Sequence, residues 1–451
     1  MSQVRAELLK EKPFRLMIKL CVPAIIGMLV VGLYSFMDAV FVGQLIGENA
    51  MGAVSVAYPF TLINNGIATL VGIGSASILS RAIGEKDYDT VDKIMGNLLV
   101  LILALSLIVS IIGVIFTRQI LSISGAGGEI LNLAERYLKI VYLGSAFVNF
   151  AQSANMVMRG EGLLKKAMVF MGIGAVINIV LDPILIILMG ERGIEGAAIA
   201  TVTAQIIQAM VTIVYFIKKS KTVRIHRIRL EMSFLPQIFS VGVSAMLMQV
   251  MSMVQQTILY NTAAAYGSDT QIILMGAALR IQAFSFIPLW GMSQGLQPVV
   301  GTNYGAKLFD RVKKTTNVFI LGAVVLALLF WFPIQLTPKA VLSLFIKDAS
   351  IVASGVGDFR LMYSIFPALG IMIMGLTFFQ AIGKGNKASV LVLLRQLVLF
   401  IPLTLLLPKT MGIVGVWAAS PLTDGLVLIL TITFLALEYR HMNCTEKESL
   451  T

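Results

Sequence analysis

The chain has 451 residues, of which 57% are hydrophobic and only 13% charged. A soluble domain is about half apolar and about a quarter charged, so we expect much of this excess to face lipid. The net charge of +12 does not indicate a nucleic-acid partner, because 25 of the 35 Lys and Arg fall in segments that we assign to the cytosolic side. That positive-inside bias places the chain in the cell membrane with both termini in the cytoplasm.

Apolar blocks long enough to cross a bilayer recur along the chain, and they lack the period of two that a membrane strand would show. Because lipid offers the backbone no hydrogen-bond partners, we predict an all-α polytopic membrane protein. The twelve predicted spans lie at roughly 15–44, 52–80, 94–117, 129–158, 166–189, 194–217, 234–262, 271–300, 315–336, 351–382, 388–407 and 411–438.

The basic segment 218–233 separates six spans from six. It divides an N-terminal lobe, residues 1–217, from a C-terminal lobe with a short cytoplasmic tail, residues 234–451. The halves also match in sequence, since Gly84 and Ala167 in the first correspond to Gly305 and Ala388 in the second at one offset of 221 residues. Six spans per copy is an even number, so we predict two six-helix lobes related by a pseudo-two-fold axis along the membrane normal, with the functional cavity between them.

Polar residues inside the spans need a reason, because a charge at the bilayer centre costs about 2.5–3.5 kcal/mol. Asp38 and Asp182 lie about seven and eight residues from the outer ends of spans 1 and 5, and Thr201 lies about seven residues into span 6 from the same side. All three fall roughly 10–12 Å below the outer surface at 1.5 Å per residue. Tyr34 and Asn178 precede the two aspartates by four residues and share their helix faces.

Two carboxylates close together in a medium of low dielectric cannot both ionise freely, which suits a proton carrier. The same oxygens could instead hold Na⁺ at Asp38, Asn178, Asp182 and Thr201. A third interpretation is that the aspartates only bridge helices. We expect no metal centre and no cofactor, because Cys21 and Cys444 form neither a disulfide framework nor a metal site. There is also no HExxH motif and no Walker loop, so we do not expect an enzyme.

Several segments resemble the multidrug and toxic compound extrusion (MATE) family in their order and spacing. They are YSFMDAVFVG (34–43), SRAIGEKD (80–87), MRGEG (158–162), NIVLDPILI (178–186) and GAAIAT (196–201). The resemblance covers the whole chain and implies that Tyr34, Asp38, Asn178, Asp182 and Thr201 form the cation-coupling site of the N-terminal lobe. Span 7 offers glutamines where another branch of the family carries an acid, so the chain is more similar to the DinF-like branch.

The side chains expected to line the substrate cavity are chosen by helix position, because flexible Met side chains and aromatic faces suit organic cations. They are Arg280, Phe36, Met37, Asn155, Met156, Met253, Gln256 and Phe284. Arg280 lies near the depth of Asp38, so it either pairs with a carboxylate or braces the lobes.

We therefore expect a monomeric antiporter that expels amphipathic, mostly cationic compounds, coupled to protons or alternatively to sodium. A lipid-linked precursor flippase of the same superfamily is the other alternative, although it would need more Lys or Arg within the spans.

The topology predicts which introduced cysteines react from outside. In a chain whose two native cysteines are replaced, a membrane-impermeant maleimide should label Thr410→Cys in intact cells, because that residue follows span 11 on the outer side. Lys307→Cys lies in a basic loop and should react only after permeabilisation. Labelling of Lys307→Cys in intact cells would overturn the cytoplasmic assignment of the termini.

Overall fold

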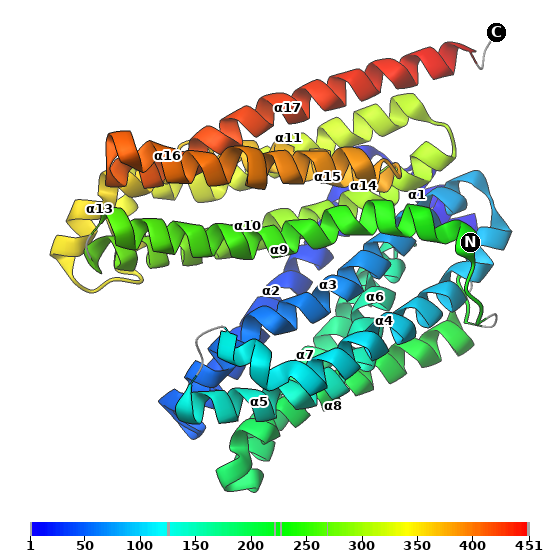
Figure 1. The fold of residues 1–451 in the computed structure, drawn as a ribbon. Helices are drawn as coiled ribbons and strands as arrows, with labels where there is room; N and C mark the ends of the chain where they lie inside the picture. The colour runs from blue at the N-terminus through cyan, green and yellow to red at the C-terminus, as the bar shows by residue number, and fades with distance from the viewer. Residues whose placement is uncertain (1, 124–126, 221, 226–227, 268, 449–451) are drawn as a thin grey trace.

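The structure, a computed structural model, describes residues 2–123, 127–220, 222–225, 228–267 and 269–448, and no strand occurs in these ranges (Figure 1). The first half contains α1 (Ser2–Lys10), α2 (Pro13–Leu45), α3 (Glu48–Glu85), α4 (Tyr88–Ile123), α5 (Gly128–Leu143), α6 (Ser145–Gly160), α7 (Leu164–Met189), η1 (Gly190–Arg192), α8 (Gly193–Val214) and η2 (Tyr215–Lys219). The second half contains η3 (Met232–Phe234), α9 (Leu235–Tyr266), α10 (Asp269–Gly305), α11 (Phe309–Leu336), α12 (Pro338–Ser343), α13 (Ala349–Met362), α14 (Phe366–Ala381), α15 (Gly385–Leu393), η4 (Leu394–Phe400), α16 (Ile401–Met411) and α17 (Ile413–Glu448). The predicted all-α fold is confirmed.

The helices account for the twelve predicted spans. Nine segments of the described chain are long and apolar enough to cross a membrane, and one of them, residues 164–219, contains both α7 and α8. The pair α13 and α14 passes the same test with a bend of 40°. The break falls just before Pro367, whose missing N–H cannot continue the hydrogen-bond ladder of α13. Helices α5 and α6, of 16 residues each, follow one another through Gly144 and make the twelfth span.

The backbone repeats the internal match found in the sequence. Lys86 and Lys307 both adopt left-handed conformations, with φ of 64° and 57°, and they are 221 residues apart. Gly162 and Gly383, at the same offset, have φ of 89° and 79°. These residues end the corresponding helices of the two halves, so each half turns its chain at equivalent places.

Reciprocal backbone contacts mark where the two halves meet. A Cβ atom on Gly84 would lie 2.2 Å from the carbonyl oxygen of Thr302, and one on Gly305 would lie 2.1 Å from that of Arg81. Arg81 and Thr302 are also 221 residues apart, so each half gives the other the same contact. This reciprocity is the property of a two-fold interface, and it requires glycine where α3 and α10 cross.

The two lobes converge at the end that carries the basic loops and diverge toward the opposite end (Figure 1). The close contacts between them follow this arrangement, since Gly74 abuts Ile238 and Gly295 abuts Cys21, all in the halves of their helices nearer the basic loops. The conformation is therefore open toward the predicted outer side of the membrane.

The N-terminal helix α1 braces the closed end. Arg5 donates from Nε to the carbonyl oxygen of Ile83 at 2.9 Å and from Nη2 to that of Gly84 at 2.8 Å, both in the N-terminal lobe. Asn303 of the C-terminal lobe donates to the carbonyl oxygen of Leu8 at 3.1 Å. One short helix therefore ties both lobes together on the predicted cytoplasmic side.

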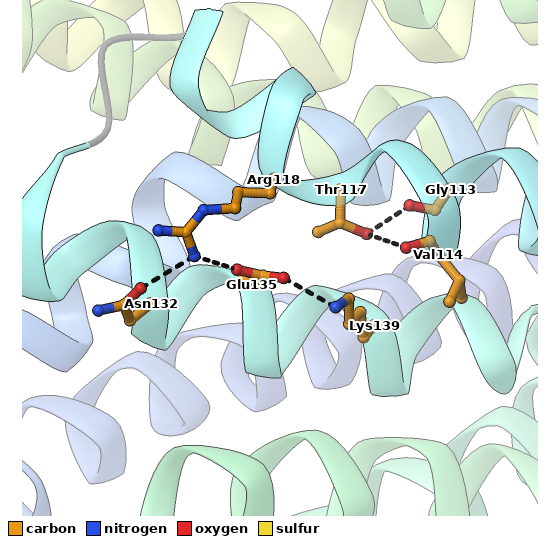
Figure 2. Close-up of polar contacts among 7 residues, drawn as sticks. All are labelled: Gly113, Val114, Thr117, Arg118, Asn132, Glu135 and Lys139. Carbon is orange, nitrogen blue, oxygen red and sulfur yellow. Dashed lines mark hydrogen bonds and ion pairs between the residues drawn. The ribbon is translucent and has the colours of Figure 1, made fainter.

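Figure 2 shows polar contacts between α4 and α5, and within each of these two helices, near the predicted outer end of the N-terminal lobe. Arg118 donates to Glu135 at 2.7 Å and to Asn132 at 3.1 Å, and Lys139 donates to the other oxygen of Glu135 at 2.7 Å. The two basic side chains are 57% and 42% exposed, so each pair contributes at most about 1 kcal/mol.

Gly84→Ala should destabilise the outward-open form. The added methyl group would meet backbone rather than a flexible side chain, and such overpacking costs about 1–3 kcal/mol. The matched control is Gly172→Ala, because a Cβ there has no neighbour within 4 Å. Thermal unfolding of the detergent-purified variants should show a lower midpoint for Gly84→Ala alone. Equal midpoints would show that the lobe crossing tolerates a side chain.

Candidate functional site

Three helices of the N-terminal lobe, α2, α7 and α8, pack together and carry the predicted coupling residues. The packing is tight because glycines remove side chains at the contacts. Gly27 of α2 lies against Met168 of α7, and Gly196 of α8 lies against the backbone of Leu185. Helix packing of this kind places the inward faces of α2, α7 and α8 around one small volume.

Asn178 is the hub of the hydrogen bonds in this volume. Its amide Nδ2 donates to Asp182 Oδ1 at 3.2 Å and to Thr201 Oγ1 at 3.2 Å. Asn178 and Asp182 are 2% and 1% exposed, whereas Thr201 is partly exposed, so the amide and the carboxyl form the buried part of this network. Together with Asp38, which lies beside Asp182, these residues are four of the five predicted coupling residues.

The carboxyl groups of Asp38 and Asp182 lie within hydrogen-bonding reach of each other. Two ionised carboxylates offer only acceptors, so this contact requires a proton on one of them or a cation between them. Like charges held this close in a low dielectric repel strongly, which gives the same requirement from electrostatics. One positive charge at this point would therefore remove the repulsion between the two carboxylates.

The remaining polar atoms of the pocket are acceptors without donors. Asp38 Oδ1, Asp182 Oδ2 and Asn178 Oδ1 are buried and have no hydrogen-bond partner among the described residues. Gln205 Oε1 has the same status, one turn after Thr201 on α8. Sequence reasoning missed Gln205, although its spacing of four residues from Thr201 puts it on the same helix face. Carboxylate, amide and hydroxyl oxygens also fit Na⁺, a hard cation.

A separate cavity of about 530 Å³ lies deeper, mostly in the C-terminal lobe and at the junction of the lobes. Its polar lining is dominated by amides, because eight glutamines face it: Gln249, Gln255, Gln256, Gln282, Gln294, Gln297, Gln380 and Gln396. Phe286 and Trp290 add aromatic surface, and two arginines, Arg159 and Arg395, also line it. Of the residues that the structure describes, no Asp or Glu contributes to this lining.

Arg395 is neutralised within the wall of this cavity. Its Nε donates to Asp424 Oδ1 at 2.8 Å, and its Nη1 lies 3.4 Å from Gln255 Oε1. Asp424 is 5% exposed, so the pair is buried and holds α17 against the π-helical segment η4. Both residues lie at similar depth in the helices of spans 11 and 12, which allows them to pair.

A family model described as MatE matches residues 23–184 and 241–406. The chain belongs to the MATE family. A multidrug export protein, MepA, of Staphylococcus saprophyticus is 29% identical over 91% of this chain and 90% of its own length. A crystal structure of a MATE protein in a bent conformation superimposes with a TM-score of 0.92 at 26% identity, covering 98% of both chains. The MATE multidrug transporter DinF-BH is 33% identical with a TM-score of 0.86, covering 94% of this chain and 95% of its own.

The comparisons confirm the predicted resemblance and the predicted fold class, an all-α membrane protein of two six-helix lobes. The MATE chain is a multi-pass membrane protein along its whole length, because the matches cover both lobes.

Helix rotation decides which predicted cavity residues face the cavity of this MATE chain. Met156 and Gln256 line it, whereas Asn155 is buried and donates to the carbonyl oxygen of Ala167 at 2.6 Å. Phe284 is 57% exposed and packs edge-on against Phe330. Met37 and Met253 are also absent from its lining. The side chains of two other predicted residues, Tyr34 and Phe36 of α2, lie outside the described residues.

Arg280 of α10 is exposed, and no carboxylate of the described residues pairs with it. The contacts of α2 with α10 nonetheless set its level. Gly291 abuts Ile25 and Gly32 abuts Ile287, so the helices run in opposite directions and Asp38 falls level with Arg280. The structure places the two charges at one depth on helices that have diverged, without bringing them together.

Proposed function

We propose that this chain exports amphipathic organic compounds from the cytoplasm by antiport against protons, through alternating access of its two lobes. The names of its relatives support the export of many compounds, since MepA is called a multidrug export protein and DinF-BH a multidrug transporter. The outward-open arrangement supports alternating access, because the lobes close only at the end that carries the basic loops.

One observation carries the choice of a proton as the coupling ion. Asp38 and Asp182 lie within hydrogen-bonding reach of each other, so a single proton on either carboxyl would join them, and the other unpartnered buried atoms nearby are acceptors. Adding a proton removes one negative charge and supplies one donor. A proton shifts the equilibrium between the outward-open and inward-open forms only if it binds one form more tightly than the other. The pocket is built from α2, α7 and α8, so a change in their packing would change its affinity for a proton.

The lining of the cavity of about 530 Å³ is suited to cationic compounds. Phe286 and Trp290 offer aromatic faces to an organic cation, and the surrounding glutamines solvate it without fixing a particular shape. The apolar wall contributed by Met248, Met372 and Leu376 accommodates the rest of such a molecule.

Sodium is the second candidate ion, favoured by the same unpaired oxygens. Amide, hydroxyl and carboxylate oxygens from α2, α7 and α8 make a ligand set suited to Na⁺, with Asp38, Asn178, Asp182 and Thr201 as its members. The two ions would leave the pocket in different charge states, because bound Na⁺ leaves both carboxylates ionised whereas a proton neutralises one of them.

We propose further that the protein works as a monomer in the cell membrane with both termini in the cytoplasm, that it has no resident cofactor and that it is not an enzyme. The positive-inside bias of the loops supports the orientation.

Removing either titratable carboxyl should abolish transport driven by a pH gradient. In proteoliposomes that are acidic on the outer face of the transporter, Asp38→Asn and Asp182→Asn should reduce efflux of a fluorescent amphipathic cation to background, because the amide keeps the shape but cannot exchange the proton. Asn178→Ala should be intermediate, since it removes two hydrogen bonds, and Thr201→Ala should be mildest. Substrate binding to the wild type should weaken as pH falls, because protonation favours release.

The matched control is Asp310→Asn, the same change at a side chain that is 81% exposed at the cytoplasmic end of α11. It should retain wild-type efflux. Transport that requires a sodium gradient at constant pH would replace the proton with Na⁺ while keeping the site. Full efflux by both Asp38→Asn and Asp182→Asn would reject the site.

A further inference from the structure

Arg159 is a buried charge in the wall of the central cavity. It belongs to the last turn of α6, its residue is 9% exposed, and its side chain lines the cavity of about 530 Å³. Its position shortly before Gly162, where the chain turns with a positive φ, brings it to the inner end of the cavity, under the closed junction of the lobes.

This guanidinium has no counter-charge within the part of the chain that the structure describes. No carboxylate there pairs with it, and no group there accepts a hydrogen bond from it. Arg395, the other arginine of the same lining, shows the usual solution, because Asp424 neutralises it at 2.8 Å. A buried cation without a partner is costly, and such residues in membrane proteins mark the path of a ligand or an ion.

The repeat shows that the fold does not need a charge at this position. The residue 221 positions later is Gln380, which also lines the cavity from the C-terminal lobe. Gln380 Nε2 donates to Ser244 Oγ at 3.0 Å, so the equivalent place is filled by a neutral amide with a partner inside the protein. The positive charge of Arg159 is therefore a property of this cavity and not of the architecture.

The surroundings of Arg159 favour an anion with an apolar part. No described Asp or Glu lines the cavity, and Gln297 contributes a buried Nε2 donor that has no acceptor among the described residues. Gln297 belongs to α10, which packs against α6. Apolar side chains from Leu369 and Ile373 complete another wall.

We propose that the central cavity binds amphipathic anions, with a carboxylate, sulfonate or phosphate group held by Arg159 and the apolar portion against α14. The proposal rests on the proposed function in one respect, that this cavity is the substrate site, and it extends the substrate range beyond cations. A free amphiphilic acid and the phosphate of a lipid headgroup share this chemistry.

The test is equilibrium binding of three matched probes to the full chain in a nonionic detergent. The dansyl derivative of 11-aminoundecanoic acid supplies the anion, its methyl ester the neutral form, and dansylated 1,11-diaminoundecane the cation. Arg159→Gln introduces the residue found at the equivalent position of the second repeat. It should lower the affinity for the acid probe by about tenfold or more, as expected for loss of a hydrogen bond to a charged group. Arg159→Lys should recover most of that loss, and the ester and cation should bind Arg159→Gln at least as well as the wild type.

The matched control is Arg192→Gln, the same change at an exposed arginine on the turn between α7 and α8. It should bind all three probes as the wild type does. Retained binding of the cation shows that Arg159→Gln is folded. Equal affinity of the acid for wild type and Arg159→Gln, or equal weakening of all three probes, would overturn the proposal.

Short-chain phosphatidylglycerol then identifies the source of the anion. Competition with the acid probe in the wild type but not in Arg159→Gln assigns the site to a lipid phosphate, and the absence of competition assigns it to free amphiphilic acids. These binding measurements use no proton gradient, so they do not depend on whether Asp38→Asn loses proton-coupled efflux. If Arg159→Gln binds the acid probe as the wild type does, the anion site is rejected but the proposed coupling site is not.

Discussion

Two carboxyl groups, from Asp38 and Asp182, lie within hydrogen-bonding reach inside one lobe, and the described residues around them supply too few donors to satisfy them. The requirement for one positive charge at this point follows from that shortage. Asn178 gives its two N–H bonds to Asp182 and Thr201, and the oxygens that remain are closed to solvent. In the proposed coupling, a proton or a monovalent cation at this point supplies the missing donor or counter-charge. Because the three helices that hold these residues are packed through glycine contacts, such a change is transmitted to helix positions and not absorbed by side chains alone.

The contacts between the two lobes allow such a local change to alter the conformation of the whole molecule. The lobes touch through backbone at Gly84 and Gly305 on the predicted cytoplasmic side, and α1 bridges them there. On the opposite side they diverge (Figure 1). An interface made of small residues at one end allows rocking, since few side chains must repack when it opens. The cavity of about 530 Å³, our proposed substrate site, lies beside this junction and mostly in the lobe that does not carry Asp38 and Asp182. Coupling between the two proposed sites would therefore pass through the contacts of α2 and α3 with α9 and α10.

The sequence was sufficient for the features that depend on distance along a helix. Hydropathy located the spans, the 221-residue offset predicted the repeat that Lys86 and Lys307 display in their backbone, and the rise per residue placed Asp38, Asp182 and Thr201 at one depth. The rotation of each helix about its own axis could not be predicted from the sequence, because neighbouring residues point about 100° apart and only packing fixes the angle. Met156 therefore faces the cavity whereas the adjacent Asn155 does not. Arg159 was missed for a different reason: it follows the end of a predicted span and counts among the basic residues of a cytoplasmic loop, but the structure folds it inward.

The proposed proton coupling requires a carboxyl group, of Asp38 or Asp182, that stays protonated at neutral pH. Infrared difference spectroscopy of the carboxyl C=O stretch, comparing the wild type with Asp38→Asn and Asp182→Asn in sodium-free buffer, measures this directly. We predict a protonated-carboxyl band at neutral pH in the wild type that shifts or weakens in each variant and is diminished by a bound substrate. A neutral-pH spectrum without that band, or one unchanged in both variants, would contradict the shared proton and with it the proposed coupling.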